Sequence, residues 1–345
     1  MDFVEIDGSQ GEGGGQILRT ALALSAATGR AFRVERIRAR RARPGLRPQH
    51  LAAVRAAALC CAAEVHGAFE GSPDLRFVPH APVAGDFEFD IGTAGAATLV
   101  AQTVAPILAT AGGESRVAID GGTHVPLAPT FHFLGRHWAP VVDRLGLRVD
   151  ATLARAGFAP KGEGRIELRT RPWTRPATLD LSVRGAFVAV RGIAGQSRLR
   201  ADVARRAADA ARALLWEARR LDSDWEVVDV PAGSPGAFLQ IEAVFEEGRA
   251  AFPVLGERGL RAELMGERAA RKLLRFLEDE EGAVDGLLAD QLAVPLAVAR
   301  GGGRVLTTEV TAHLETVAAI LGLFGIAAET WGRRGGPGGL SVGRW

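Results

Sequence analysis

Residues 4–39 read VEIDGSQGEGGGQILRTALALSAATGRAFRVERIRA, and this stretch decides the fold because its pattern recurs along the chain. A glycine-rich turn is followed by a helical segment with apolar residues three and four apart, and then by an alternating segment typical of a strand. Residues 44–65 supply a second helix that opens near His50. The unit is therefore predicted to be β-α-β-α-β-β.

The same pattern returns in residues 87–150 and again in residues 283–330, where the second helices begin around His132 and His313. A repeated unit of this size buries its apolar face by stacking against its neighbours. The sequence thus predicts an α/β fold, with α+β layers, in which helices pack on one face of each sheet. Comparable helix starts should lie close together.

The repeat is interrupted between residues 184 and 279, where long helical and strand segments follow a different order. This stretch predicts a smaller βαβ-type domain inserted into the third unit. The expected division is a large domain of residues 1–183 and 280–345 and an inserted domain of residues 184–279.

Composition excludes several classes of protein. With 345 residues, of which 47% are hydrophobic, the chain can build a large core and is not expected to be disordered. No stretch approaches the roughly 20 apolar residues of a membrane span, and the charged N-terminus does not resemble a signal peptide. The only two cysteines, Cys60 and Cys61, are adjacent and form no metal-binding pattern. These features favour a cytoplasmic protein.

The glycine-rich turn, GSQGEGGGQILR at residues 8–19, either is an ordinary tight turn or binds phosphate through backbone N–H groups at a helix start. It is no Walker A loop, because no GK[ST] follows, and Gln16 stands where the Rossmann pattern needs its third glycine. Glu12 lies within this turn, where a carboxylate beside phosphates would hold a divalent ion.

His313 opens the last helix in TAHLETV. A lone histidine is often structural, but a helix N-terminus disfavours imidazolium, so a neutral and nucleophilic ring is the alternative. Asp290, Gln291 and Gln102 are polar positions in otherwise apolar helices and either are exposed or face a ligand. Eight arginines between residues 30 and 47, against the single acid Glu35, form either a solvated face or a surface for phosphates.

With these residues assembled, the chain resembles the RNA 3′-terminal phosphate cyclase family over nearly its whole length. The resemblance rests on several segments in the same order: DGSQGEGGGQILR, IRARRARPGLRPQHL, IGTAGAATLVAQTVAP, GGTHVPLAP, GFAPKGEG, GERG, LADQL and TAHLETV. It implies three βαβαββ repeats resembling the translation initiation factor C-terminal fold, with a smaller inserted domain.

The resemblance also implies an activity. Family members are ligases that use ATP and Mg²⁺ or Mn²⁺ to convert an RNA 3′-phosphate into a 2′,3′-cyclic phosphate, releasing AMP and pyrophosphate. RNA 3′-phosphate ends are the implied partner, with no membrane and no protein partner indicated.

Site residues carried over from the family fall into four groups. His313 matches the histidine that carries AMP, and Glu12 matches the metal-binding glutamate. The positions that match the nucleotide pocket are Gln102, Leu287, Leu288, Ala289, Asp290 and Gln291. The positions associated with the substrate phosphates are Arg19, Arg38, Arg41 and Gln49. Leu287 departs from the aromatic residue or histidine frequent in relatives, so only a backbone contact is expected there.

Two alternatives remain. A non-catalytic ribosome-assembly branch of the family lacks the histidine, whereas this chain has His313. Enolpyruvyl transferases share a repeated βαβαββ architecture, and there the arginines would bind phosphorylated metabolites. The two lysines of the chain, Lys161 and Lys272, do not occur in the KxDG setting of lysine-dependent nucleotidyl-transferring ligases. Histidine is therefore the expected AMP carrier.

Overall fold

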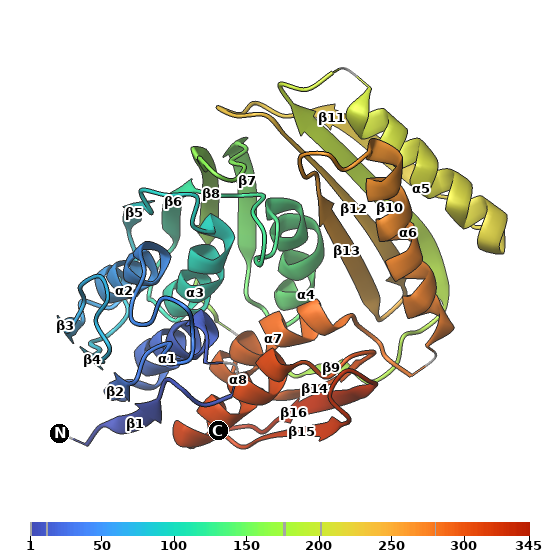
Figure 1. Ribbon diagram of the computed structural model, residues 1–345. Coiled ribbons are helices and arrows are strands. Elements are labelled where there is room, and N and C mark those ends of the chain that lie inside the picture. Colours follow the sequence, from blue (N-terminus) through green and yellow to red (C-terminus); the bar gives the residue numbers. More distant parts are fainter. Residues whose placement is uncertain (1, 12, 175–176, 201, 280) are drawn as a thin grey trace.

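The computed structural model describes residues 2–11, 13–174, 177–200, 202–279 and 281–345. Four four-stranded sheets and the helices that cover them make up these parts of the chain (Figure 1). Within them, no helix combines the length and the apolar character that a membrane crossing requires.

The first repeat joins a strand to a buried helix through the glycine-rich turn. Its elements are β1 (Val4–Asp7), α1 (Gly15–Thr28), β2 (Phe32–Glu35), α2 (Pro48–Cys60), β3 (Glu64–His66) and β4 (Leu75–Val78). β1 pairs with β2 in parallel, whereas β4 is antiparallel to both β2 and β3. The sheet order is therefore β1-β2-β4-β3.

The second repeat has the same topology with an irregular second helix. Its elements are β5 (Asp86–Asp90), α3 (Ala97–Ala109), β6 (Ser115–Gly121), the π-helix η1 (Phe133–Trp138), α4 (Ala139–Asp143), β7 (Val149–Arg155) and β8 (Gly164–Thr170). The sheet order β5-β6-β8-β7 matches the first repeat position by position. A π-helical turn widens the helix and is frequent at functional sites.

The third repeat completes the set. Its elements are β9 (Leu179–Leu181), α7 (Gly286–Val298), β14 (Gly303–Thr307), α8 (Ala312–Leu323), β15 (Ala328–Gly332) and β16 (Gly338–Val342). β9 and β14 pair in parallel and β16 is antiparallel to β14 and β15, so the order is again first-second-fourth-third. Three units of one topology confirm the predicted βαβαββ fold.

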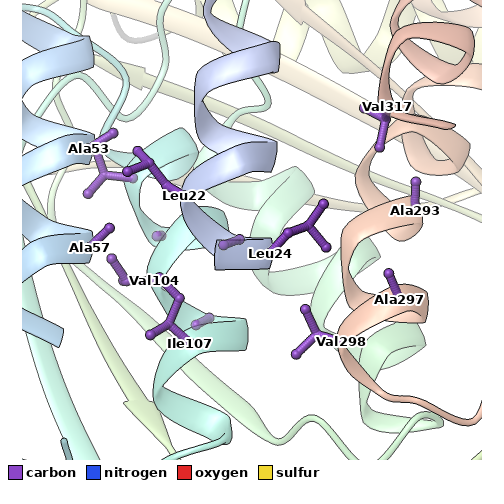
Figure 2. Packing of buried hydrophobic residues seen from close by; sticks show 14 of the residues in the cluster. Leu22, Leu24, Ala53, Ala57, Val104, Ile107, Ala293, Ala297, Val298 and Val317 are labelled. Atoms are coloured by element: carbon purple, nitrogen blue, oxygen red, sulfur yellow. The ribbon is translucent and has the colours of Figure 1, made fainter. Parts of the chain in front are cut away.

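Helices from all three repeats pack together between the sheets. α1 is central, because it contacts α2, α3, α7 and α8. Figure 2 shows Leu22 of α1 directed toward the α2 side and Leu24 toward the α7 side. Both side chains are fully buried, and burial of each contributes about 1.5–3 kcal/mol. This shared packing fixes the helix starts relative to one another.

A fourth sheet lies in the chain between β9 and α7. Its elements are β10 (Phe187–Ser197), α5 (Val203–Arg219), β11 (Asp224–Asp229), β12 (Gly236–Phe245), β13 (Arg249–Leu255) and α6 (Ala262–Glu278). α5 and α6 pack on each other and on this sheet, and their apolar side chains form a cluster separate from that of the repeats (Figure 1). Domain limits at residues 184 and 279 stay a prediction.

Strand β13 was not expected from the sequence. It carries Pro253, which cannot donate to a strand ladder and argues against a central strand. The sheet order β11-β10-β12-β13 places β13 at an edge, where one side of the strand needs no hydrogen-bond partner. The inserted region therefore has four strands, β10 to β13, of which the predicted βαβ order accounts for two.

Candidate active site

One cavity of about 510 Å³ is lined by residues from all three repeats, the second contributing Leu99 of α3 and residues 127–129 of a loop. The predicted residues that line it are Arg19, Arg38, Arg41, Gln49, Leu287, Asp290, Gln291 and His313. They come from the starts of α1, α2, α7 and α8 and from the loop that precedes α2. The expectation that comparable helix starts lie together therefore holds for the first helix of each repeat and for the second helices α2 and α8.

The remaining predicted residues lie elsewhere. Gln102 lines a small cavity of about 30 Å³ together with Arg19 and Asp290, both of which also line the main cavity. Leu288 and Ala289 are fully buried in the hydrophobic core, so only their backbone could face a ligand. Glu12 lies outside the described residues.

His313 sits in the first turn of α8, and the start of this helix is held by Thr311. The Thr311 hydroxyl accepts the backbone N–H of Leu314 at 3.0 Å and donates to the Asp290 carboxylate at 2.5 Å. This pair of bonds caps α8 and ties it to α7. His313 and Asp290 are thereby fixed in one place, on two helices that share a cavity.

The start of α7 is held by Asp285, which is buried and caps the helix. Its carboxylate accepts the backbone N–H of Leu288 at 2.9 Å and that of Ala251, on β13, at 3.0 Å. His137 of η1 contacts the same carboxylate through Nε2 at 2.9 Å. The segment that bears Asp290 is thus joined to both the second repeat and the inserted sheet.

His137 extends this connection to a charged residue. Its Nδ1 accepts from the Nε–H of Arg249 at 3.1 Å, which leaves Nε2 to donate to Asp285. Arg249 also bonds the Glu242 carboxylate at 3.1 Å. A continuous hydrogen-bond network therefore runs from the start of α7 through η1 to strands β12 and β13.

The turn is rich in glycine because neighbouring helices approach its backbone too closely for a Cβ atom. A Cβ on Gly15 would lie 2.5 Å from Nε2 of His50 and 2.8 Å from a guanidinium nitrogen of Arg19. Gly11 has a left-handed φ of 53°, and a Cβ there would meet the Thr316 hydroxyl at 2.3 Å. The turn is pressed between α2 and α8, where its backbone can approach a ligand.

His50 lines the cavity and was missed as a site residue, although the repeat pattern placed it at a helix start. Burial lowers the pKa of His50 to about 3, and three nearby guanidinium groups add to the shift. Its Nδ1 accepts the backbone N–H of Arg47 at 3.1 Å, so the proton of the neutral ring is on Nε2, next to Gly15. The signal that could have found it is its match in position to His313.

Positive charges crowd this side of the cavity. Arg38 donates to the carbonyl oxygens of Arg43 at 2.7 Å and Gly45 at 3.0 Å, which fixes its guanidinium group. Partial burial, with the like charges of Arg41 and Arg47, lowers the pKa of Arg38. Guanidinium groups held together at such a cost are typical of a site that receives phosphate.

Gln102 provides a second sign of a ligand. It is 9% exposed, and within the described parts of the chain neither its amide nitrogen nor its amide oxygen has a hydrogen-bond partner. An unsatisfied buried polar group costs about 1–3 kcal/mol, so such groups are rare without a function. A nucleobase edge, which carries both donors and acceptors, fits an amide with both atoms open.

The second repeat's histidine does not join this cavity. His132 lies at the start of η1, but its Nδ1 is 2.9 Å from Nε2 of His124. Both imidazole rings stack on Phe238 of β12 with centroids 4.3 Å away. Burial lowers the pKa of His124 and brings the pKa of His132 to about 3. The expected grouping of three histidines is therefore wrong, because the inserted sheet covers the second one.

A metal ion finds few ligands among the residues described. No group of three His, Cys, Asp or Glu side chains suited to a metal occurs in those parts of the chain. Asp290 is the one carboxylate that lines the cavity there, and it already accepts the Thr311 hydroxyl. The expected metal ligand, Glu12, is outside them.

Together, the glycine-rich turn at a helix start, the clustered arginines and the adjacent histidine define an α/β protein with a basic pocket. Over residues 10–328 the sequence matches the RNA 3′-terminal phosphate cyclase family, and the chain belongs to that family.

Relatives that carry the name RNA 3′-terminal phosphate cyclase span nearly the whole chain. One from Methylococcus capsulatus is 42% identical over 335 residues, which cover 95% of this chain and 92% of the relative. One from Ralstonia nicotianae is 44% identical over 326 residues, covering 93% and 91%. One from Pyrobaculum aerophilum is 42% identical over 323 residues, covering 93% and 92%.

Among solved structures, the enolpyruvyl transferase NikO from Streptomyces tendae aligns with a TM-score of 0.27 and 14% identity, covering 48% of this chain and 33% of that one. A likeness at this level carries no argument about fold or function.

Proposed function

We propose that this chain converts an RNA 3′-terminal phosphate into a 2′,3′-cyclic phosphate in an ATP-dependent reaction, with His313 as the carrier of AMP. The names of its relatives support the cyclase activity. The observation that carries the mechanism is that His313 lines the same cavity as Arg19, Arg38 and Arg41.

The first step joins His313 to the nucleotide. A ring nitrogen attacks the α-phosphorus of ATP, a P–N bond forms, and the P–O bond to pyrophosphate breaks. The arginines and the backbone N–H groups at the start of α1 would bind the departing phosphates. Gln102, with both amide atoms open, would bind the adenine edge.

Two further transfers follow. The terminal RNA 3′-phosphate attacks the phosphorus on His313, the P–N bond breaks, and an RNA-(3′)pp(5′)A end forms. The neighbouring ribose 2′-OH then attacks the activated 3′-phosphorus and expels AMP, with its proton passing to solvent. This last step is intramolecular, so proximity supplies much of the rate and little is asked of a protein base.

A divalent ion, Mg²⁺ or Mn²⁺, belongs to this proposal through Glu12. When bound, such an ion would screen the charge of the polyphosphate. Among the described residues, the arginines supply the positive charge at the cavity.

The activity is tested by labelling. Protein is incubated with α-labelled ATP and either metal and analysed on a denaturing gel, for wild type, His313→Ala and the control His66→Ala. His66 is exposed on β3 and does not line the cavity, so its variant should label like wild type. Wild type should carry a label that is labile in acid and stable in alkali, because a phosphoramidate has this stability. His313→Ala should carry no label, because it lacks the imidazole that forms the bond.

Absence of label on folded wild type with both metals would overturn the covalent mechanism. The non-catalytic ribosome-assembly alternative would then be favoured. Retention of label in His313→Ala would place the AMP on another residue. Cyclisation itself is followed with a 3′-phosphorylated oligoribonucleotide, whose end should become resistant to phosphatase only when ATP is present.

A further inference from the structure

A second cavity adjoins the first. It has a volume of about 660 Å³ and lies between the loop of residues 124–130, the edge strand β13 and helix α6. Leu127 and Ala128 line both cavities. A chain-like ligand with its end beside His313 can therefore continue into the second cavity along one surface.

One wall of the second cavity is basic. Arg268, Arg271, Lys272 and Arg275 line it from α6, and their spacing of three, four and seven residues puts them on one helix face. Arg271 is engaged by Glu267 at 2.9 Å. Arg268 and Lys272 are exposed and make no ion pair within the described ranges of the chain.

Acidic groups offset this charge only slightly. Glu257 is the one carboxylate that lines the second cavity among the described residues. Arg268, Lys272 and Arg275 thus line the cavity from a single helix face without an ion pair in the described parts of the chain. Negatively charged groups spaced along a chain are ligands that satisfy such cations.

The part of the lining that the loop of residues 124–130 contributes is mostly apolar and contains a strained residue. Leu127 is fully exposed and has a φ of 63°, a left-handed conformation that costs a non-glycine residue about 1–3 kcal/mol. Pro126 precedes it in the same loop and also lines the cavity. An apolar side chain held in this conformation at the junction of two cavities fits a role in contacting a flat apolar group.

We propose that the second cavity holds the nucleotides that precede the terminal 3′-phosphate of a single-stranded RNA. Their phosphodiesters lie along Arg268 and Lys272, and their bases lie against Pro126 and Leu127. A single strand offers alternating anionic and flat apolar groups, which match the two walls. The direction of the strand rests on the proposed function, since that places the terminal phosphate beside His313.

The test compares binding of a long and a short RNA. A fluorescent twelve-nucleotide RNA and a dinucleotide, both 3′-phosphorylated, are titrated without ATP over a range of salt concentrations. We expect Arg268→Ala/Lys272→Ala to weaken binding of the twelve-mer about tenfold and to lower its salt slope by about 1.4, since each single-strand phosphate contact contributes about 0.7.

Variants separate charge from apolar contact. Leu127→Ala should weaken binding of the twelve-mer without a change in salt slope, because it removes no charge. The matched control is Arg205→Ala/Arg219→Ala on α5, where both arginines are outside the cavity and make no ion pair in the described residues. This control should bind both RNAs as wild type does.

Three outcomes would overturn the proposal. In the first, Arg268→Ala/Lys272→Ala binds the twelve-mer with wild-type affinity. In the second, wild type binds the twelve-mer and the dinucleotide equally well. In the third, an acidic peptide of equal charge displaces the twelve-mer as well as unlabelled RNA does, which would assign the surface to an acidic protein segment.

The proposed function can fail separately. His313 labelling with ATP needs no RNA, so a wild type that is unlabelled but binds RNA with length dependence would overturn only the function. A labelled wild type without length dependence would overturn only the strand site.

Discussion

The buried carboxylate of Asp285 should be essential to the stability of the site. It accepts three N–H groups, from Leu288, Ala251 and His137, on only two oxygens. Asp285→Asn keeps the shape but replaces one oxygen with an NH₂ group. If that group faces Leu288, one buried donor loses its acceptor, and if it faces Ala251 and His137, two donors do.

The magnitude follows from these contacts. A buried donor left without an acceptor costs about 1–3 kcal/mol, and the loss of charge from the remaining bonds adds to this. We expect Asp285→Asn to lower the free energy of unfolding by about 2–4 kcal/mol, which is a large part of the usual 5–15 kcal/mol. Asp285→Ala, which also removes the helix cap, should cost more.

Unfolding in urea, followed by circular dichroism, measures the stability, and ATP titration measures the site. Binding should weaken because α7 carries Asp290 and Gln291. The control is Asp222→Asn, which should change stability by less than about 0.5 kcal/mol. Its exposed carboxylate accepts the backbone N–H of Ser223 and no other donor among the described residues. An Asp285→Asn protein as stable as this control would refute the reasoning.

Three further outcomes are expected. Gly15→Ala should reduce His313 labelling at least tenfold, because the new methyl group meets His50. The control Gly112→Ala should label like wild type, because a Cβ at that position would meet no atom of the described residues within 4 Å. Equal labelling of the two variants would contradict the close packing at Gly15. Gln102→Leu should raise the free energy of unfolding by about 1–3 kcal/mol while weakening ATP binding. If calorimetry shows that the variant loses both stability and ATP affinity, the Gln102 amide has hydrogen-bond partners in the folded protein. His50 has a pKa of about 3 in the folded protein and about 6.5 when unfolded, so the unfolded state binds the extra proton first. The free energy of unfolding should therefore fall as the pH drops below 6.5, by about 2 kcal/mol at pH 5. Urea unfolding at pH 6.5 and pH 5 should show a smaller fall for His50→Gln, and an unchanged fall would exclude His50 as its source.

The repeated fold could be predicted because its signals are local. Glycine turns, helical spacing and strand alternation are all visible within one unit, and their threefold recurrence makes each instance more informative. Strand β13 escaped this reasoning because Pro253 argues against a strand, and its edge position depends on pairing with β12. Sheet order is a property of distant contacts, which local patterns do not contain.

Much of the cavity lining could also be predicted, because those residues lie at helix starts with recognisable sequence. The network that supports them could not. His137 and Asp285 are 148 positions apart in sequence, and Arg249 is 112 positions from His137. No spacing rule connects such residues, so their roles appear only once the sheets are placed.

The three histidines show where the repeat argument stops. His50, His132 and His313 occupy comparable positions, and local sequence treats them alike. Insertion of the fourth sheet breaks this equivalence, because Phe238 of that sheet stacks on His132 and removes it from the shared cavity. The same sheet carries Arg249, which reaches the cap of α7 through His137. The inserted sheet therefore keeps His132 out of the cavity and also supports α7, the helix that is bonded to the start of α8 near His313.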